Sequence, residues 1–406
     1  MKISKLIGYI FFTLLINAVI GLRAEADTHT AANCTVSAVQ TAVNAAVDGD
    51  TVLIPDGSCS WSTGISTTKQ IKIRAQNYTP TLGGNTSRSV TITNNSSSPL
   101  FSLTSGDSYH VGIAGIRFNE GTGDVNHIRF NGTGSKIPLI NDCYFQVKDR
   151  SGNQPDIGIL ALLSQGGVMW NCYVAANVSN GVGNASIYIS SPRAWYTAST
   201  LGNLDTNGTV NWYFEDNTFF NVGQCPDIDN NGRVVIRYSS LDGSGGLTHG
   251  FTSSWGGRHF EYYNNTFSVT TEERNHVGRY FWARAGHGIF TDNVVNDSSY
   301  PGAYGHVTLL STIVEGGGSY PKPRQVGWGH NGSTNVIDPI YIWNNTGARG
   351  STWGTDSPTY IQLNREIYVN SGAKPGYSKY TYPHPLRNQG SSDTTPPSPP
   401  TGLGIQ

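Results

Sequence analysis

Charged side chains are scarce in this sequence, and long apolar runs are confined to its first residues. Asp, Glu, Lys and Arg make up 13% of the 406 residues, against about 25% in an average soluble protein. The net charge is −1 and the chain has no block of Lys or Arg, which argues against nucleic acid as a partner. After residue 50 there is also no 3.6-residue apolar periodicity, which argues against a helical fold.

The chain does contain a short phrase that recurs after apolar stretches. Successive copies begin 22 residues (217 to 239) to 29 residues (142 to 171) apart, or about twice that. The copies are Asp142-Cys143-Tyr144, Asn171-Cys172-Tyr173, Asn217-Thr218-Phe219, Ser239-Ser240-Leu241, Asn265-Thr266-Phe267, Asn293-Val294-Val295 and Asn345-Thr346-Gly347. Repetition at this interval predicts a solenoid, in which each unit buries its apolar face against its neighbours.

The stretch before each copy predicts a strand, because its residues are β-branched or aromatic and alternate with a period of two. Asn tolerates the left-handed backbone region and suits a sharp corner. We therefore predict an all-β, single-domain right-handed parallel β-helix of about ten coils over residues 27–385. Residues 386–406 are rich in Pro, Ser and Thr and predict a linker or tail. The alternative fold is a β-sandwich, which would show spacings of about 8–12 residues and no fixed corner phrase.

Residues 1–26 predict an export signal. Lys2 and Lys5 form a charged start, residues 6–22 are apolar, and Ala24-Glu25-Ala26 supplies a small-x-small cleavage pattern. The interrupted apolar run is short for a membrane span. We expect a secreted or periplasmic protein without membrane attachment after cleavage; a retained N-terminal anchor is the alternative.

The beginning of the mature chain predicts a helical cap over residues 36–47. An amphipathic helix can close the exposed end of a solenoid, and Gly49-Asp50-Thr51-Val52, an apolar strand and then Pro55 and Gly57 follow it. The apolar face of the helix consists of Val36, Val39, Val43 and Val47. This opening resembles the N-terminal cap of pectin-lyase-like β-helix proteins, and together with the repeats the resemblance covers residues 34 to about 350. The resemblance implies the fold rather than an activity.

Export makes the five cysteines candidates for disulfides. Cys34 and Cys59 bracket the cap, and we predict that they are bonded. Cys143 and Cys172 share one register in adjacent coils, where they form either a disulfide or a reduced stack. Cys225 has no partner in the sequence.

Alternation within the strands predicts which side chains face outward. If Phe260 and Tyr262 point inward, the flanking residues point out and stack at about 5 Å per coil. The outward columns are then Arg233, His259 and His287, and Glu215, Arg237 and Tyr263. Such a face fits a groove for an extended anionic polymer. The alternative is a solvated face with a salt bridge between Glu215 and Arg237.

Histidine and arginine gather in one region: six of the ten histidines lie between residues 249 and 330. For each of them, a surface or turn role is the alternative to catalysis. His can act as base or acid near neutral pH, and Arg is a permanent cation for a carboxylate. We therefore predict a polysaccharide lyase that cleaves a uronate polymer by β-elimination, in which cations hold the charge developing on the carboxylate. The assignments are His249 as base or acid; Arg233, Arg258 and Arg284 as neutralising cations; His259, Glu261 and His287 as further catalytic candidates; and Arg237, Tyr263 and Trp282 as groove contacts.

A calcium ion is a further candidate. Residues 227–232 have the Asp-x-Asp-x-Asn-Gly start of a calcium loop, which makes Asp227, Asp229 and Asn231 candidate ligands. Tyr238 stands where the bidentate Glu is expected, so a plain turn is the alternative. Apart from this ion we expect no cofactor.

Two other functions stay open. A glycoside hydrolase needs two carboxylates across the scissile bond; Gly286-His287-Gly288 is similar to one element of polygalacturonase-type hydrolases, but the chain has no Asp-Asp pair. A non-catalytic adhesin or tailspike-like protein that binds extracellular polysaccharide is the other alternative. In each case we expect a monomer.

Overall fold

The structure, a computed structural model, describes residues 26–388 except 79, 81–87, 124, 148–159, 177–186, 193–204, 224, 251–255, 270–278, 297–307, 316–324 and 331–334. The predicted export signal, apart from Ala26, and the predicted tail beyond residue 388 lie outside the described residues. Within the described part, no helix is both long and apolar enough to cross a membrane.

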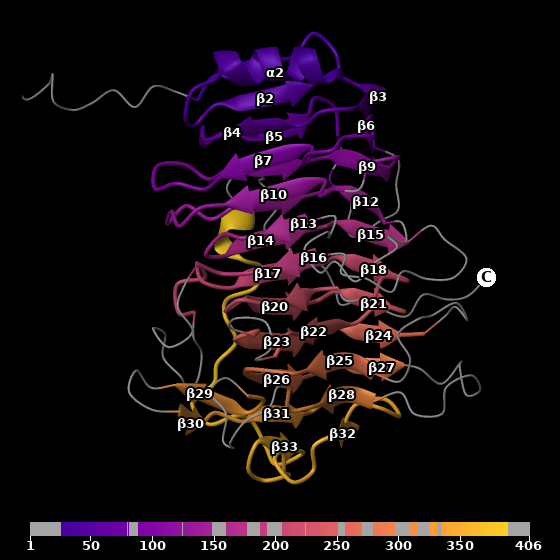
Figure 1. Ribbon diagram of the computed structural model, residues 1–406, viewed down its shortest axis with the longest axis vertical. Helices are drawn as coiled ribbons and strands as arrows, with labels where there is room; N and C mark the ends of the chain where they lie inside the picture. The colour runs from indigo at the N-terminus through magenta and orange to yellow at the C-terminus, as the bar shows by residue number, and fades with distance from the viewer. Residues whose placement is uncertain are drawn as a thin grey trace, which may run out of the picture.

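Three parallel sheets stack coil upon coil along one axis (Figure 1). Sheet A has 12 strands, sheet B nine and sheet C ten. Each coil adds one strand to each sheet in turn, and each strand pairs in parallel with the equivalent strand of the next coil. The prediction of a right-handed parallel β-helix is therefore confirmed. A separate antiparallel pair joins β29 (Trp328–His330) to β30 (Asn335–Ile337).

The strands have the following bounds. Sheet A consists of β1 (Thr28–Thr30), β2 (Thr51–Ile54), β5 (Lys72–Ala75), β8 (Gly112–Ala114), β11 (Leu139–Asn141), β14 (Gly167–Trp170), β17 (Trp212–Glu215), β20 (Arg233–Arg237), β23 (His259–Tyr263), β26 (His287–Thr291), β31 (Ile340–Trp343) and β33 (Ile367–Val369). Sheet B consists of β3 (Gly57–Trp61), β6 (Val90–Asn94), β9 (Ile116–Glu120), β12 (Tyr144–Val147), β15 (Tyr173–Ala176), β18 (Thr218–Phe220), β21 (Ser240–Asp242), β24 (Thr266–Ser268) and β27 (Val294–Asn296). Sheet C consists of β4 (Ile65–Thr67), β7 (Phe101–Thr104), β10 (Ile128–Asn131), β13 (Leu160–Leu162), β16 (Ile187–Ile189), β19 (Asp227–Ile228), β22 (Gly246–Thr248), β25 (Arg279–Ala283), β28 (Thr308–Thr312) and β32 (Trp353–Thr355).

The corner between sheets A and B uses two successive positions. The first is left-handed, with φ between 52° and 57° at Asp142, Asn171, Asp216, Tyr238, Asn264, Asp292 and Asn344. The second forms a side-chain ladder: the Asn265 N–H donates to Asn293 Oδ1 at 3.0 Å, and the Asn293 N–H donates to Asn345 Oδ1 at 2.9 Å. Through this ladder, the backbone N–H groups at the corner find hydrogen-bond acceptors inside the stack of coils.

The first two copies of the corner phrase need a correction of one residue. Asp142 and Asn171 were aligned with the ladder, but they occupy the left-handed position. Cys143 and Cys172 stand in the ladder instead, and the Cys172 N–H donates to Asn217 Oδ1 at 2.8 Å. The left-handed position also favours Asn and Asp, so residue type alone does not separate the two positions. Both cysteines are buried and free, as is Cys225, which matches the reduced-stack alternative.

Alternation separates an inner core from an outer cluster, as predicted for sheet A. Phe260 and Tyr262 belong to the core enclosed by the three sheets. Tyr213, Val235 and Tyr263 belong to a second apolar cluster on the outer face of sheet A. An apolar cluster outside a solenoid sheet needs a cover, because otherwise it would lie in water.

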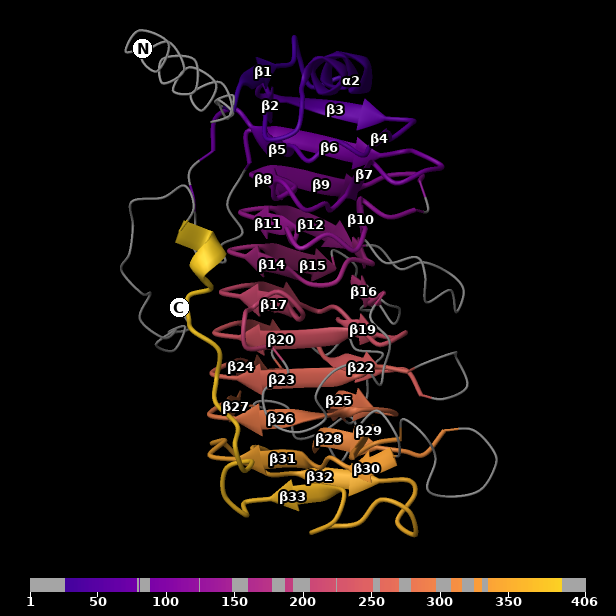
Figure 2. The same cartoon turned by 90° about the vertical axis from the view of Figure 1, so that its left-hand side faces the viewer.

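The cover is a C-terminal strap, residues 371–388, which turns back after the last coil. Figure 2 shows it in yellow running along the outer face of sheet A toward the middle coils. Tyr377, Tyr380 and Leu386 of the strap pack against the outer apolar cluster. The strap ends in a short 3-10 helix, η1 (Pro385–Asn388), which spans the expected start of the linker.

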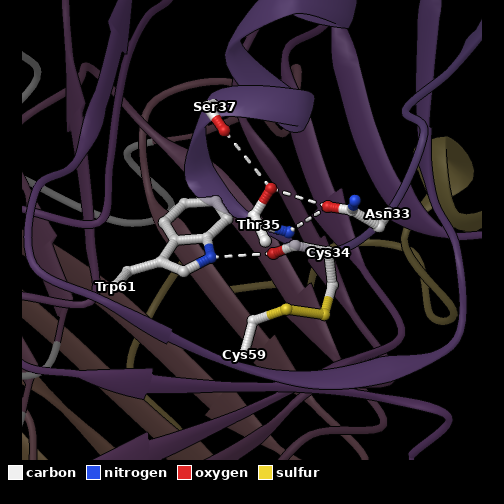
Figure 3. Close-up of a disulfide and its surroundings, with 6 residues drawn as sticks. All are labelled: Asn33, Cys34, Thr35, Ser37, Cys59 and Trp61. Carbon is white, nitrogen blue, oxygen red and sulfur yellow. Dashed lines mark hydrogen bonds between the residues drawn. A yellow bond between two sulfur atoms is a disulfide. The ribbon is translucent and has the colours of Figure 1, made fainter.

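The first coil is closed by α2 (Val36–Ala45), whose buried side chains are Val39, Ala42 and Val43. The predicted helix was two residues too long: Val47 lies beyond its end and is 59% exposed. The predicted Cys34–Cys59 disulfide is confirmed, with a Cα–Cα distance of 5.8 Å. The Trp61 Nε1–H donates to the Cys34 carbonyl at 2.9 Å beside it (Figure 3). The cap is thus tied to the first strand of sheet B.

Candidate functional site on the outer face of sheet C

The outward columns predicted for sheet A exist but are covered. Arg233 pairs with His259, and His259 pairs with His287, in adjacent strands. Their exposed fractions are only 1%, 2% and 0%. Burial lowers the pKa of His259 and of His287, so both imidazoles are neutral near pH 7.

Polar side chains of the strap contact His287 directly and His259 through Glu261. Lys374 Nζ lies 2.6 Å from Asp338 Oδ1 and 3.2 Å from His287 Nδ1. The Tyr377 hydroxyl donates to Glu261 Oε2 at 2.6 Å. The other Glu261 oxygen, Oε1, lies 2.8 Å from His259 Nε2. These groups therefore form a buried network between sheet and strap.

The second column is held in the same way. Arg237 Nε donates to Glu215 Oε1 at 2.8 Å, and Arg237 Nη1 donates to the Tyr263 hydroxyl at 2.7 Å. Arg237 also donates to the carbonyls of Tyr380 at 2.6 Å and Thr381 at 2.7 Å in the strap. Burial disfavours the charged guanidinium, but Glu215 and Tyr263 outweigh it and raise the pKa of Arg237.

The outer face of sheet A is therefore not the open groove expected from the sequence. Both alternatives assumed a solvated surface, whereas the strap removes these side chains from water. The predicted Glu215–Arg237 salt bridge is present, but it is fully buried. Arg258 is buried as well, and burial, opposed by Asp338, lowers its pKa to about 10. The structure thus groups Arg233, Arg258, His259 and His287 away from solvent.

His249 lies elsewhere, on the outer face of sheet C. It follows β22, and its Nε2 lies 3.1 Å from the carboxylate of Asp227 in the adjacent strand β19. The His249 side chain is 19% exposed, and the Asp227 side chain is fully buried. Burial raises the pKa of the Asp227 carboxyl. Burial also opposes the charged form of His249, but the hydrogen bond to Asp227 outweighs it and raises the pKa of His249.

Arg284 follows β25 in the next coil and lies beside this pair. Its Nε donates to the Thr248 carbonyl at 3.0 Å, directly before His249. Its Nη1 lies 2.5 Å from Glu315 Oε1, and Glu315 Oε2 accepts the Gly250 N–H at 3.0 Å. The Arg284 and Glu315 side chains are 13% and 16% exposed. A partly exposed imidazole and guanidinium thus share one surface.

Outward residues of neighbouring strands extend this surface. Register pairing places Tyr188 beside Asp227, Asp227 beside Leu247, and Leu247 beside Trp282. The Tyr188 hydroxyl donates to Asp229 Oδ2 at 3.3 Å. We call the surface formed by Tyr188, Asp227, His249, Trp282 and Arg284 the sheet C site.

Two of the three candidate calcium ligands have hydrogen-bond partners within the protein. The Asp227 carboxylate lies against His249, and Asp229 Oδ1 accepts the Asn230 N–H at 2.7 Å. Asn231 is buried in a left-handed turn with φ of 66°. No three His, Cys, Asp or Glu side chains converge as metal ligands in the part of the chain that the structure describes. The proposed reaction does not use Ca²⁺.

The sequence alone assigned no role to Tyr188, Arg279, Glu315 or Asp338. One signal was available for the pairing of Asp227 with His249: they are 22 residues apart, which equals the shortest interval of the repeat. Loops of variable length hide the remaining partners, since Glu315 lies 31 residues after Arg284.

Comparison with solved structures finds other proteins whose chains follow a similar path. A pectin methylesterase from Aspergillus niger is 14% identical over 87% of this chain and 92% of its own, with a TM-score of 0.39. A PL6 family polysaccharide lyase from Pseudopedobacter saltans is 13% identical over 89% of each chain, with a TM-score of 0.41. No protein-family model and no curated protein sequence matches the chain. The strand topology, rather than these similarities, establishes the fold.

Proposed function

We propose that this protein is an exported polysaccharide lyase that cleaves a uronate-containing polymer by β-elimination at the sheet C site. The observation that carries the proposal is the His249–Asp227 pair. It combines a partly exposed imidazole with a buried carboxylate partner at 3.1 Å. A carboxylate that orients an imidazole and raises its pKa is a common arrangement for general base catalysis.

The proposed reaction assigns one role to each group. Neutral His249 takes the proton from the sugar carbon next to the uronate carboxylate. The electron pair left on that carbon forms the new C=C bond as the neighbouring carbon–oxygen bond of the glycosidic linkage breaks. The leaving oxygen takes up a proton, so the products are an unsaturated sugar end and a free hydroxyl.

Arg284 is the proposed cation for the developing negative charge on the carboxylate. It is partly exposed and stands beside His249, whereas Arg233 and Arg258 are 1% and 0% exposed. The strap likewise covers His259, Glu261 and His287, and also Arg237 and Tyr263. None of these seven residues enters the proposed reaction. Asp227 is a positioning residue, and Trp282 remains the proposed contact to the polymer.

The test is incubation of the mature protein with alginate, pectate and glycosaminoglycan, followed by absorbance of the unsaturated product. We expect product with one polymer and a loss of turnover of about 10²–10⁴-fold in His249→Ala, the usual contribution of a general base. The matched control is His110→Ala, whose half-buried ring contacts the Ile137 carbonyl at 2.8 Å far from the site; we expect it to retain activity. Full turnover by His249→Ala contradicts the assigned role. Binding without product from any polymer would replace the lyase by a polysaccharide-binding protein.

A further inference from the structure

Two arginine side chains lie against one tryptophan at the sheet C site. The guanidinium carbon of Arg279 lies 3.8 Å from the centroid of the Trp282 ring, and that of Arg284 lies 4.7 Å from it. All three residues belong to β25 or follow it directly. Stacking on an aromatic ring holds a guanidinium in place without using its N–H donors.

The two guanidinium groups differ in their partners. Arg284 is paired with Glu315. Among the described residues, the guanidinium of Arg279 makes no hydrogen bond or ion pair, and it stacks on Trp282. Burial lowers the pKa of Arg279, the carboxylate of Asp356 opposes this shift, and the positive charge of Arg284 adds a smaller lowering. The Arg279 guanidinium therefore keeps its N–H donors unused within the described part of the chain.

The indole of Trp282 also has a hydrogen-bond donor without an acceptor among the described residues. Its Nε1–H is shielded from water and has no acceptor in the described part of the chain. A shielded donor without an acceptor costs about 1–3 kcal/mol. A carboxylate beside Arg279 would thus meet guanidinium donors that the described residues leave unused.

We propose that Arg279, Trp282 and Arg284 form a subsite for the carboxylate of the uronate residue next to the one that is cleaved. The inference rests on the proposed function and deepens it, because it makes Arg279 a specificity-determining residue. The planar, five-donor guanidinium of Arg279 matches a carboxylate in bidentate geometry. A neutral sugar at this position would offer the Arg279 guanidinium no anionic partner. The protein should therefore require acidic sugars at neighbouring positions along the polymer.

The test is calorimetric binding to the uncleaving His249→Ala protein. The probes are purified tetrasaccharides of mannuronate and galacturonate, a sulfated carrageenan tetrasaccharide and neutral maltotetraose. We expect one uronate probe to bind, with affinity falling as salt rises. Adding Arg279→Gln should weaken that binding about tenfold, the loss of one charge-assisted contact. Arg279→Lys keeps the charge without the planar fork and should lie between the two.

The matched control is Arg129→Gln, which removes an exposed arginine from the outer face of the same sheet, five strands or roughly 24 Å away. We expect it to leave the affinity unchanged. Equal binding by Arg279→Gln, or equal binding of maltotetraose, overturns the subsite. Tighter binding of the sulfated probe overturns the assignment to a carboxylate. Two outcomes separate the subsite from the lyase. If the wild-type protein cleaves no polymer, and Arg279 is nevertheless needed to bind uronate, the subsite is supported and the lyase is refuted. If the wild-type protein cleaves a polymer and Arg279→Gln leaves kcat/KM unchanged, the lyase is supported and the subsite is refuted.

Discussion

Replacement of Arg237 by Met would test how the strap is held on sheet A. Met keeps an apolar stem of similar length and removes the guanidinium. The lost contacts are the ion pair with Glu215, the hydrogen bond to the Tyr263 hydroxyl, and the hydrogen bonds to the carbonyls of Tyr380 and Thr381. Two of these four partners belong to the strap, so we expect the substitution to release it.

The expected cost follows from burial. Arg237 and Glu215 are both 0% exposed, and removing one member of a buried pair typically costs about 3–5 kcal/mol. Glu215 keeps two partners, because Arg387 Nη1 and the His384 N–H remain at 2.8 and 3.1 Å. We therefore expect the lower part of that range, about 3 kcal/mol, which corresponds to a population of the open strap raised about 10²-fold.

Trypsin provides the assay, because Lys379 and Arg387 are cleavage sites within the strap. When the strap closes faster than it is cut, the rate of cleavage follows the open population, so the Arg237→Met rate should rise about 10²-fold. The control is Asp292→Asn, which weakens the partly exposed ion pair with Lys379. Such a pair contributes less than about 1 kcal/mol to stability. Cleavage of Arg237→Met at the wild-type rate would refute the account of the strap.

Three further predictions concern the site and the scaffold. Because the hydrogen bond to Asp227 outweighs burial and raises the pKa of His249, turnover should rise with pH through that raised value, and Asp227→Asn should move the rise to lower pH. The stability that the raised pKa of His249 contributes should be complete below about pH 6.5 and lost as pH increases through the raised pKa. Asn293→Ala should lower the free energy of unfolding in urea by about 2–4 kcal/mol, because it leaves buried ladder amides without partners; Asn293→Ser, the residue already found at one ladder position, should cost less. Replacing both Cys34 and Cys59 by Ser should lower the unfolding free energy measured in urea by about 3–4 kcal/mol for the 25-residue separation, and an unchanged urea midpoint would contradict the stabilising role of the disulfide.

The fold could be predicted from the sequence because it is repeated at the level of single residues. Each coil must bury its strands against the next, so alternation and the corner phrase recur in almost every copy. The alignment on the corner gave the correct neighbours for Arg233, His259 and His287. It failed by one residue only where Asp142 and Asn171 satisfied the left-handed position instead of the ladder.

The sequence repeat does not predict whether the outward side chains are accessible to solvent. The strap contacts sheet A across long separations: Tyr377 reaches Glu261 over 116 residues, and Arg387 reaches Glu215 over 172. No local pattern marks such a cover. Outward orientation was therefore equated with exposure, although Arg237 and His259 point outward and are buried under the strap. His249 lies on a different sheet, where no strap residue contacts it among the described residues.

The most direct test of the sheet C site is a crystal structure of the His249→Ala protein with a bound tetrasaccharide of the polymer that the wild-type protein cleaves. The account predicts the sugar on the outer face of sheet C, with carboxylates at Arg284 and Arg279 and a ring near Trp282. A sugar bound along sheet A, with the strap displaced from Arg237 and Glu261, would contradict it.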